Sequence, residues 1–139
     1  MNTRFALAVH VLTLLAALPR ELQRSESMAA SAGTNPVHVR RILGQLRDAG
    51  LVASRPGPGG GWQLIATPEA TTLRDVWHAV QGDELVLGVH EVSPNCPEGR
   101  RIRADLLAIE RRAAAAVEAE LATTTLAELA RASVLRSAS

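Results

Sequence analysis

The sequence predicts a mainly α-helical fold with one small β-hairpin, and three observations lead to this fold class. Hydrophobic residues make up 47% of the 139-residue chain but aromatic residues only 2%, so the core must consist of aliphatic side chains, which favours helices. A segment rich in proline and glycine, residues 55–61, separates two short apolar segments, as a hairpin loop does. Elsewhere, apolar residues recur at helical spacing.

The apolar run from residue 5 to residue 18 predicts the first helix. It follows Arg4 and is interrupted by His10 and Thr13. A secretory signal has a similar pattern, but no small-residue cleavage site follows this run. A helix that spans a bilayer needs about 20 apolar residues, and no stretch of this chain approaches that length. We therefore expect a soluble, cytoplasmic protein that does not bind a membrane.

Two helices joined by a sharp turn are predicted next. Ser25 is suited to cap the first of them, and Gly33 to end it in a left-handed conformation. Asn35 then caps a second helix, and Pro36 occupies its first position, where the missing N–H costs nothing. The second helix has apolar residues at i, i+3, i+4 and i+7, which form a buried stripe: Val39, Ile42, Leu43 and Leu46.

A β-hairpin is predicted directly after these helices. Residues 51–54 form the first strand, residues 55–61 the loop and residues 62–66 the return strand. A glycine-rich loop can also hold the phosphates of a nucleotide, but that loop joins a strand to a helix and usually precedes a lysine, and this chain contains no lysine. Two helices and a glycine-rich hairpin are the layout of a winged helix, whose second helix enters the DNA major groove.

The part of the chain after the hairpin is predicted to be helical, with one irregular connection at residues 85–90. The longest helix has apolar residues at alternating spacings of three and four: Ile102, Leu106, Ile109, Ala113 and Val117. At 1.5 Å per residue it would extend roughly 39 Å, more than a small domain covers, so this stripe is a candidate dimer interface. The alternative is that it packs on its own domain. The predicted helices are residues 72–81, capped by Thr71 or Thr72, residues 97–122, and residues 125–131, which are a further candidate for the dimer interface.

Charge divides the chain into two unequal parts. Residues 1–62 carry seven Arg and three acidic residues, whereas residues 63–139 carry eight Arg and eleven acidic residues, so the net charges are +4 and −3. A basic part followed by an acidic part is typical of a nucleic-acid-binding module joined to a segment that does not touch DNA. We therefore expect a DNA-binding domain at residues 1–80, and a connection with the long and terminal helices at residues 81–139.

Four segments resemble one family of regulators. They are residues 35–52 (NPVHVRRILGQLRDAGLV), residues 56–64 (PGPGGGWQL), residues 72–80 (TLRDVWHAV) and residues 95–100 (NCPEGR). Together they resemble the Rrf family of winged-helix regulators, to which IscR, NsrR and CymR belong, and within it the YwnA-like members with one cysteine. The resemblance extends over nearly the whole chain.

The resemblance implies a transcriptional regulator that binds a palindromic operator in double-stranded DNA. Family members form a homodimer through the long helix, and repression is the default expectation. The alternative function is a winged-helix module that binds proteins without specific DNA binding. An enzyme is not expected, because the chain shows no metal-ligand spacing, no paired carboxylates and no Gly-x-Ser-x-Gly motif. Neither a metal nor a cofactor is predicted.

Base edges are expected to be contacted from the start of the second helix of the predicted pair, by His38, Arg40 and Arg41. Small polar residues and backbone N–H groups at the two helix starts are expected to hold phosphates, as is Arg4. Arg55 and the loop tip, residues 58–61, are expected to touch the flanking backbone or the minor groove. The full set of predicted DNA-binding residues is Arg4, Ser25, Ser27, Thr34, Asn35, Pro36, His38, Arg40, Arg41, Arg55, Gly59, Gly60 and Gly61.

Cys96 is the only cysteine of the chain and precedes Pro97 at the predicted start of the long helix. Cluster-binding relatives use three cysteines before this helix, and one thiolate does not supply the usual ligands of an iron–sulfur cluster. The remaining possibility for a cluster is one that two subunits share and that is also held by ligands other than cysteine. The helix start, Arg100 and Arg101 favour a thiolate, and Glu98 opposes it. We hypothesise that Cys96 senses an oxidant or a low-molecular-weight thiol; the alternative is a purely structural residue.

Overall fold

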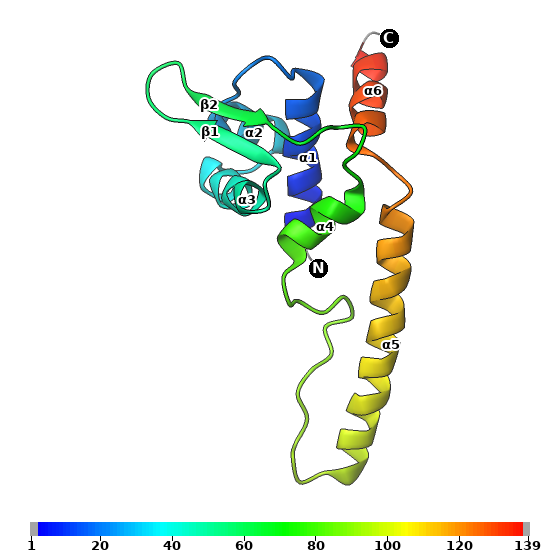
Figure 1. Cartoon of the computed structure of the whole chain (residues 1–139). Coiled ribbons are helices and arrows are strands. Elements are labelled where there is room, and N and C mark those ends of the chain that lie inside the picture. Colours follow the sequence, from blue (N-terminus) through cyan, green and yellow to red (C-terminus); the bar gives the residue numbers. More distant parts are fainter. Residues whose placement is uncertain (1–2, 138–139) are drawn as a thin grey trace.

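The computed structural model describes residues 3–137, and it confirms the mainly helical fold with one β-hairpin. In Figure 1, α1 to α4, the hairpin and α6 gather at one end, and α5 extends away from them. The elements are α1 (Thr3–Ala17), α2 (Ser25–Ala32), α3 (Pro36–Asp48), β1 (Val52–Arg55), β2 (Gly61–Leu64), α4 (Leu73–Gln81), α5 (Pro97–Leu121) and α6 (Leu126–Ser137).

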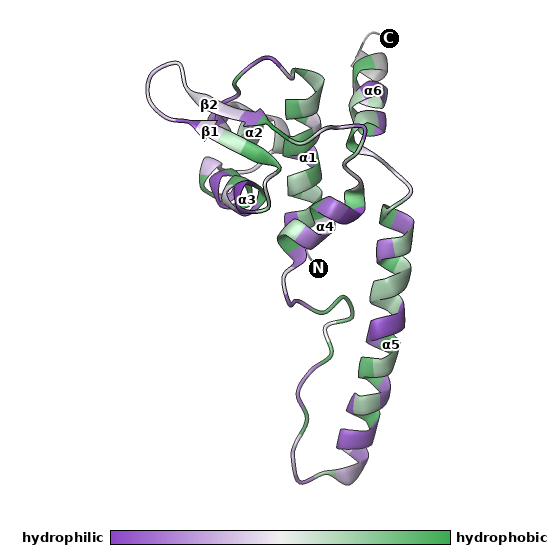
Figure 2. Ribbon diagram, viewed as in Figure 1, coloured by the Kyte–Doolittle hydropathy of each residue, from purple (hydrophilic) through white to green (hydrophobic). Residues whose placement is uncertain are grey.

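The core is built around α1, which packs against α2, α3, α4 and α6. Four of its residues, Ala8, Val11, Leu12 and Leu15, are at most 1% exposed. Figure 2 shows α1 mostly in the green of hydrophobic residues, and these four lie where neighbouring helices enclose them. The predicted stripe of α3 is also buried and faces this core: Val39, Ile42, Leu43 and Leu46.

Two of the three helix caps predicted for α2 and α3 are present, and both lie in the turn between these helices. Gly33 has a φ of 66° and ends α2, and the side chain of Asn35 accepts a hydrogen bond from the His38 N–H at 3.1 Å. The prediction that Ser25 caps α2 is wrong. The backbone of Gln23 pairs with Trp62, and the backbone stays extended as far as Arg24. Arg24 therefore occupies the cap position, and Ser25 is the first residue of the helix and is buried.

The hairpin pairs Val52 with Leu64 and Arg55 with Gly61, within one or two residues of the predicted strands. It is attached to the helices through Gln23, whose backbone exchanges hydrogen bonds of 2.9 and 2.8 Å with Trp62. The Gln23 side chain also donates to the Leu14 carbonyl at 2.8 Å. These bonds hold the wing at a set orientation relative to α1.

Helix α6 closes the core of the winged domain. Leu126 is fully buried in the same cluster as the α1 residues, and its N–H donates to the Thr71 carbonyl at 2.8 Å. Thr125 caps α6 by accepting from the Glu128 N–H at 3.2 Å, and Thr72 forms a capping box with Asp75 at the start of α4. The core thus includes residues on both sides of position 80, and α6 runs further than the predicted end at residue 131.

In residues 3–137 we find no helix that is both long enough and apolar enough to cross a membrane.

Candidate nucleic-acid interface

Helix α3 presents a free face opposite its buried stripe. Successive helix residues are separated by about 100°, so Val37, Arg41 and Gly44 lie on this face. Val37 is 56% exposed and Arg41 is exposed, and a Cβ added at Gly44 would meet no atom within 4 Å. This face of α3 is therefore open to a partner. Because Gly44 has no side chain, a partner can come closer to the helix backbone at this position.

Arg40 and Arg41 are adjacent in sequence but have different surroundings. The guanidinium of Arg40 forms an exposed ion pair with Glu26 of α2 at 3.4 Å. A backbone hydrogen bond, and to a smaller extent Arg40, lower the pKa of Glu26, so this carboxylate stays ionised. Arg41 has no acidic partner within the described part of the chain. Arg41 is thus the more available of the two side chains.

The predicted phosphate ligands near α2 differ in their accessibility. Ser27 is exposed and Thr34 is half-buried, whereas Ser25 is 6% exposed and its hydroxyl lies 3.4 Å from a carboxylate oxygen of Glu26. Asn35 already uses its side chain to cap α3, with Pro36 beside it at the helix start. Asn35 is exposed but engaged as a cap, so Ser27 and Thr34 are the side chains of this set that are at least partly exposed and not used as caps.

The wing combines an exposed tip with a tightly packed base. Arg55 and Gly59 are exposed, and Gly59 has a φ of 74°, which favours glycine. Gly60 is buried, and a Cβ there would lie 2.0 Å from the Arg55 carbonyl oxygen. A Cβ at Gly61 would lie 2.8 Å from the Gln23 carbonyl oxygen, so Gly60 and Gly61 shape the base of the wing. Trp62 lies beside Arg47, whose guanidinium carbon is 5.7 Å from the ring centroid.

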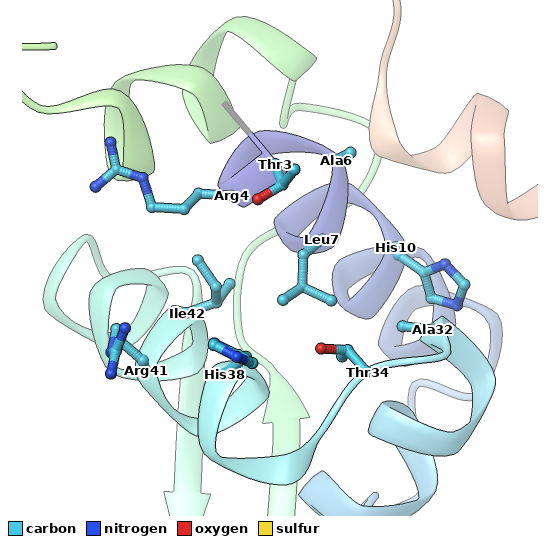
Figure 3. Close-up of a pocket in the computed structure, with 10 residues that line it drawn as sticks. All are labelled: Thr3, Arg4, Ala6, Leu7, His10, Ala32, Thr34, His38, Arg41 and Ile42. Carbon is cyan, nitrogen blue, oxygen red and sulfur yellow. The ribbon is translucent and has the colours of Figure 1, made fainter. Parts of the chain in front are cut away.

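Arg4 lies on α1, across a cavity from the start of α3. Its guanidinium forms an ion pair with Glu84, which follows α4. In Figure 3, Arg4 and Arg41 lie at the same side of a cavity between α1 and α3, with His38 at the cavity's edge. The structure thus places Arg4 in the same cavity wall as Thr34, His38 and Arg41, but the ion pair with Glu84 engages its guanidinium.

Helix α5 has an apolar stripe that the described chain covers only in part. Of its 25 residues only Glu110 is buried, whereas Ile102 and Ile109 are 56% and 42% exposed. The stripe is completed by the half-buried Leu106, Ala113 and Val117. A helix of this length with one buried residue lacks the tertiary packing that normally stabilises helices.

The adjoining side of α5 holds the connection that leads to it. The carboxylate of Glu110 accepts hydrogen bonds from the backbone N–H groups of Val86 and Leu87, the latter at 2.8 Å. Arg103 donates to the His90 carbonyl at 3.2 Å. Near the other end of α5, Glu118 lies 2.6 Å from Nε2 of His78 on α4. These contacts orient α5 so that the apolar stripe stays outside.

Cys96 caps the start of α5. Its half-buried Sγ accepts a hydrogen bond from the Gly99 N–H at 3.3 Å and lies 3.8 Å from a carboxylate oxygen of Glu98. The Arg100 guanidinium donates to the Pro94 carbonyl. Residues 3–137 contain no group of three or more His, Cys, Asp or Glu side chains placed to hold a metal ion.

Three residues with a part in this arrangement, two near the α3 surface and one on α5, were not identified from the sequence. Glu26 stands between two serines at the start of α2, and Gly44 interrupts an otherwise good helix, which is a signal for a close approach. Glu110 has no local signal, because its partners lie more than twenty residues away.

Comparison with known proteins gives consistent matches over most of the chain. The model of a family described as Rrf2, iron-dependent transcriptional regulator, matches residues 1–132. The HTH-type transcriptional regulator YwnA of Bacillus subtilis is 37% identical over 130 residues, which are 93% of this chain and 96% of YwnA. The solved structure of CymR, the global cysteine regulator of B. subtilis, is 25% identical, with a TM-score of 0.67 over 94% of this chain and 95% of CymR. IscR of T. potens has a TM-score of 0.71 at 20% identity, over 96% of this chain and 87% of IscR, and this likeness concerns the fold.

Proposed function

Because the chain belongs to the Rrf2 family of DNA-binding transcriptional regulators, we propose that it acts as a homodimeric repressor on a palindromic operator. The family match confirms the resemblance found in the sequence. The observation that carries the proposal is the exposed face of α3, which stands beside the wing and is not covered by any other described element. The regulator acts on the chromosome, so we place it in the cytoplasm.

We propose that α3 reads bases through Arg41 and Val37. Arg41 is exposed and without an acidic partner in residues 3–137, so its guanidinium is free to contact O6 and N7 of guanine. Val37 offers an apolar contact to the methyl group of thymine. Gly44 lies one helical turn further along and lets the helix backbone come close to the groove. His38 lies at the side of this face, next to the cavity in Figure 3.

The remaining predicted residues position the protein on the DNA backbone in this proposal. Ser27, Thr34 and the N–H groups at the starts of α2 and α3 face phosphates of one strand. Arg40 contacts a phosphate when it leaves Glu26. Arg55 and Gly59 contact the flanking backbone from the wing, and Ser25, Asn35, Pro36, Gly60 and Gly61 act by shaping the surface. Arg4 reaches a phosphate only if its ion pair with Glu84 opens.

The exposed stripe of α5 supports a homodimer. Ile102, Leu106, Ile109, Ala113 and Val117 form one line, and a second copy of the same helix offers the same line in return. Such a dimer would hold two α3 helices about 34 Å apart, or a multiple of this distance, and hence favour a palindromic operator. In this proposal residues 1–80 bind DNA and residues 81–139 join the subunits, while α6 also closes the core.

The family is described as iron-dependent, but the residues of this chain do not fit an iron–sulfur cluster. Such clusters are held mainly by cysteine thiolates, four in the common forms. Cys96 is the single cysteine, and its Sγ already accepts the Gly99 N–H as a helix cap. A cluster therefore has no part in the regulation proposed for this chain.

Cys96 remains a candidate for redox control of DNA binding. Oxidation by peroxide would convert the thiolate to a sulfenic acid, and a low-molecular-weight thiol would then form a mixed disulfide with release of water. Either product enlarges the side chain at the cap of α5 and removes or weakens the bond to Gly99. Because α5 carries the proposed dimer interface, a shift at its start changes the distance between the two α3 helices.

Replacing Cys96 by serine tests this redox proposal. We expect peroxide or diamide to weaken operator binding of the wild-type protein about tenfold or more, and to leave Cys96→Ser unaffected, because serine keeps a cap but has no thiol. Fluorescence anisotropy with labelled operator measures both proteins, reduced and oxidised. An equal response of the two proteins, or no response of either, would exclude Cys96 as the sensor and leave the regulator function intact.

Replacing Gly44 by alanine is expected to change operator affinity and protein stability in opposite directions. Alanine favours a helix interior over glycine by roughly 0.5–1 kcal/mol, and its Cβ meets no atom of the chain, so the free energy of unfolding should rise. If the middle of α3 approaches the bases, the added methyl group should lower operator affinity, about fivefold for a cost near 1 kcal/mol. Urea unfolding and anisotropy measure the two effects. Unchanged affinity in the stabilised variant would contradict the proposed approach of α3 to DNA.

The proposed function as a whole is tested by titrating the protein with the DNA upstream of its own gene and with a scrambled duplex. Specific binding to the upstream DNA, with an affinity that falls steeply as salt rises, is the expected result. Equal and weak binding to both duplexes would contradict an operator at this position and would call for selection of binding sites from random DNA.

A further inference from the structure

A cavity of about 490 Å³ lies between α1, the turn after α2 and the start of α3. Its ten lining residues come from all three segments, and Figure 3 shows the side chains of Leu7 and Ile42 in its interior, with Thr34 and His38 at the lower edge. The size falls within the range of small-molecule sites. The cavity lies on the flank of α3 and includes Arg41, which we propose as a base-reading residue.

The chemistry of the lining favours an anion with an apolar part. Four of the ten lining residues are basic and none is acidic: Arg4, His10, His38 and Arg41. Glu84 neutralises Arg4, and His10 is hydrogen-bonded to Ser31 at 2.9 Å, so the charge that faces the cavity comes mainly from Arg41. The remaining walls include Ala6, Leu7, Ala32 and Ile42, which offer apolar surface and no charge. A phosphate of the DNA backbone would use the cation but would leave this apolar surface unfilled.

We propose that this cavity binds a small organic anion, such as a carboxylate on an aromatic or aliphatic body, and that the anion competes with operator DNA. The inference rests on the proposed function, because it assigns the cavity as the effector site of the DNA-binding domain. The carboxylate pairs with Arg41, with His38 and Thr34 as further hydrogen-bond partners, and the apolar body lies against Leu7 and Ile42. An Arg41 side chain held in this way is not available to a base, so the anion releases the repressor from its operator.

Binding to the cavity is tested by NMR titration of the labelled, full-length protein with benzoate. Benzamide serves as the uncharged probe of the same shape, and inorganic phosphate as the anion without an apolar body. Benzoate, up to about 10 mM, is expected to shift the amide signals of Leu7, Thr34 and His38 with a Kd of roughly 1 mM or lower, and the other two probes to bind more weakly. No shift with benzoate would overturn the proposal. Equal shifts with phosphate would also overturn it, since they would assign the cavity to the DNA backbone.

A variant that fills the cavity provides a second test of where the anion binds. Ala6 is exposed on α1 and lines the cavity, so Ala6→Phe adds a ring there without entering the core. Ala115→Phe adds the same ring at an exposed position of α5 and is the matched control. We expect Ala6→Phe to abolish the benzoate shifts, whereas Ala115→Phe keeps them. Benzoate shifts that persist in Ala6→Phe would show that the anion binds elsewhere.

Competition with DNA is measured by anisotropy at constant ionic strength, with sodium chloride in place of benzoate in the reference. If the two ligands exclude each other, benzoate at ten times its Kd weakens operator binding about tenfold per subunit, hence about 100-fold for the proposed dimer, in the wild type and not in Ala6→Phe. An unchanged operator affinity at saturating benzoate would overturn the competition. If the protein binds no specific operator, the proposed function fails, while the NMR titration still decides whether the cavity holds the anion.

Discussion

Replacing Ile109 by glutamate is expected to convert the protein to a monomer and to weaken operator binding by about 10²–10⁴-fold. Ile109 lies at the centre of the exposed stripe of α5 and is 42% exposed within one chain, so a glutamate there is tolerated by the single subunit. In a dimer the same position would bury two facing carboxylates against apolar side chains, which is strongly unfavourable. A monomer holds only one half-site, and the gain from linking two binding modules is lost.

Ala115→Glu is the control for this prediction, because it adds the same charge on the opposite side of the same helix. Ala115 is exposed and lies outside the stripe. Sedimentation velocity should show a dimer for the wild type and for Ala115→Glu, and a monomer for Ile109→Glu. Circular dichroism checks that the helices are retained. A dimeric Ile109→Glu protein that still binds the operator tightly would show that the stripe of α5 is not the interface between subunits.

The parts of the fold that follow from local sequence signals were predictable, and those that depend on distant contacts were not. Gly33, Asn35 and Pro36 define the turn between α2 and α3 through their own backbone preferences, and the structure has this turn. Ser25 has the same kind of local signal, but the pairing of Gln23 with Trp62 moved the cap to Arg24. A local preference of about 1 kcal/mol is readily overruled by such tertiary contacts.

The terminal helix shows the same limit at a larger scale. Its helical pattern was visible in the sequence, but its partner was not, because Leu126 packs on α1 more than one hundred residues away. Glu110 likewise has no sequence signal as an anchor of Val86 and Leu87, since a glutamate on a long helix usually faces solvent. The Glu110 carboxylate can be buried because it accepts hydrogen bonds from two backbone N–H groups, which only the structure reveals.

The difference between Arg40 and Arg41 also required the structure. From the sequence both were equal candidates for base contacts, because they are adjacent at the start of α3. Glu26 of α2 pairs with Arg40 only, since Arg41 points about 100° further around the helix. In the protein without DNA, the guanidinium of Arg40 is therefore paired with a carboxylate, whereas that of Arg41 has no acidic partner in residues 3–137.

Replacing Arg41 by alanine is accordingly expected to cost about 1–3 kcal/mol of operator binding, roughly 5- to 150-fold in Kd, and to relax the choice of base at one position of each half-site. Replacing Arg40 by alanine should cost less, because the gain from its DNA contact is offset by the ion pair with Glu26 that must open. Neither change should alter the free energy of unfolding by more than about 0.5 kcal/mol, since both side chains are exposed.

Anisotropy competition with operators that differ at single base pairs separates the two roles. For Arg41→Ala, one base pair of the half-site should cease to matter, whereas the penalties at the others persist. For Arg40→Ala, affinity should fall evenly for all sequences, and the slope of log K against log salt should become less steep by about one, as for the loss of a phosphate contact. If Arg40→Ala relaxes the sequence preference and Arg41→Ala does not, the ion pair with Glu26 prepares Arg40 for base reading instead of restraining it.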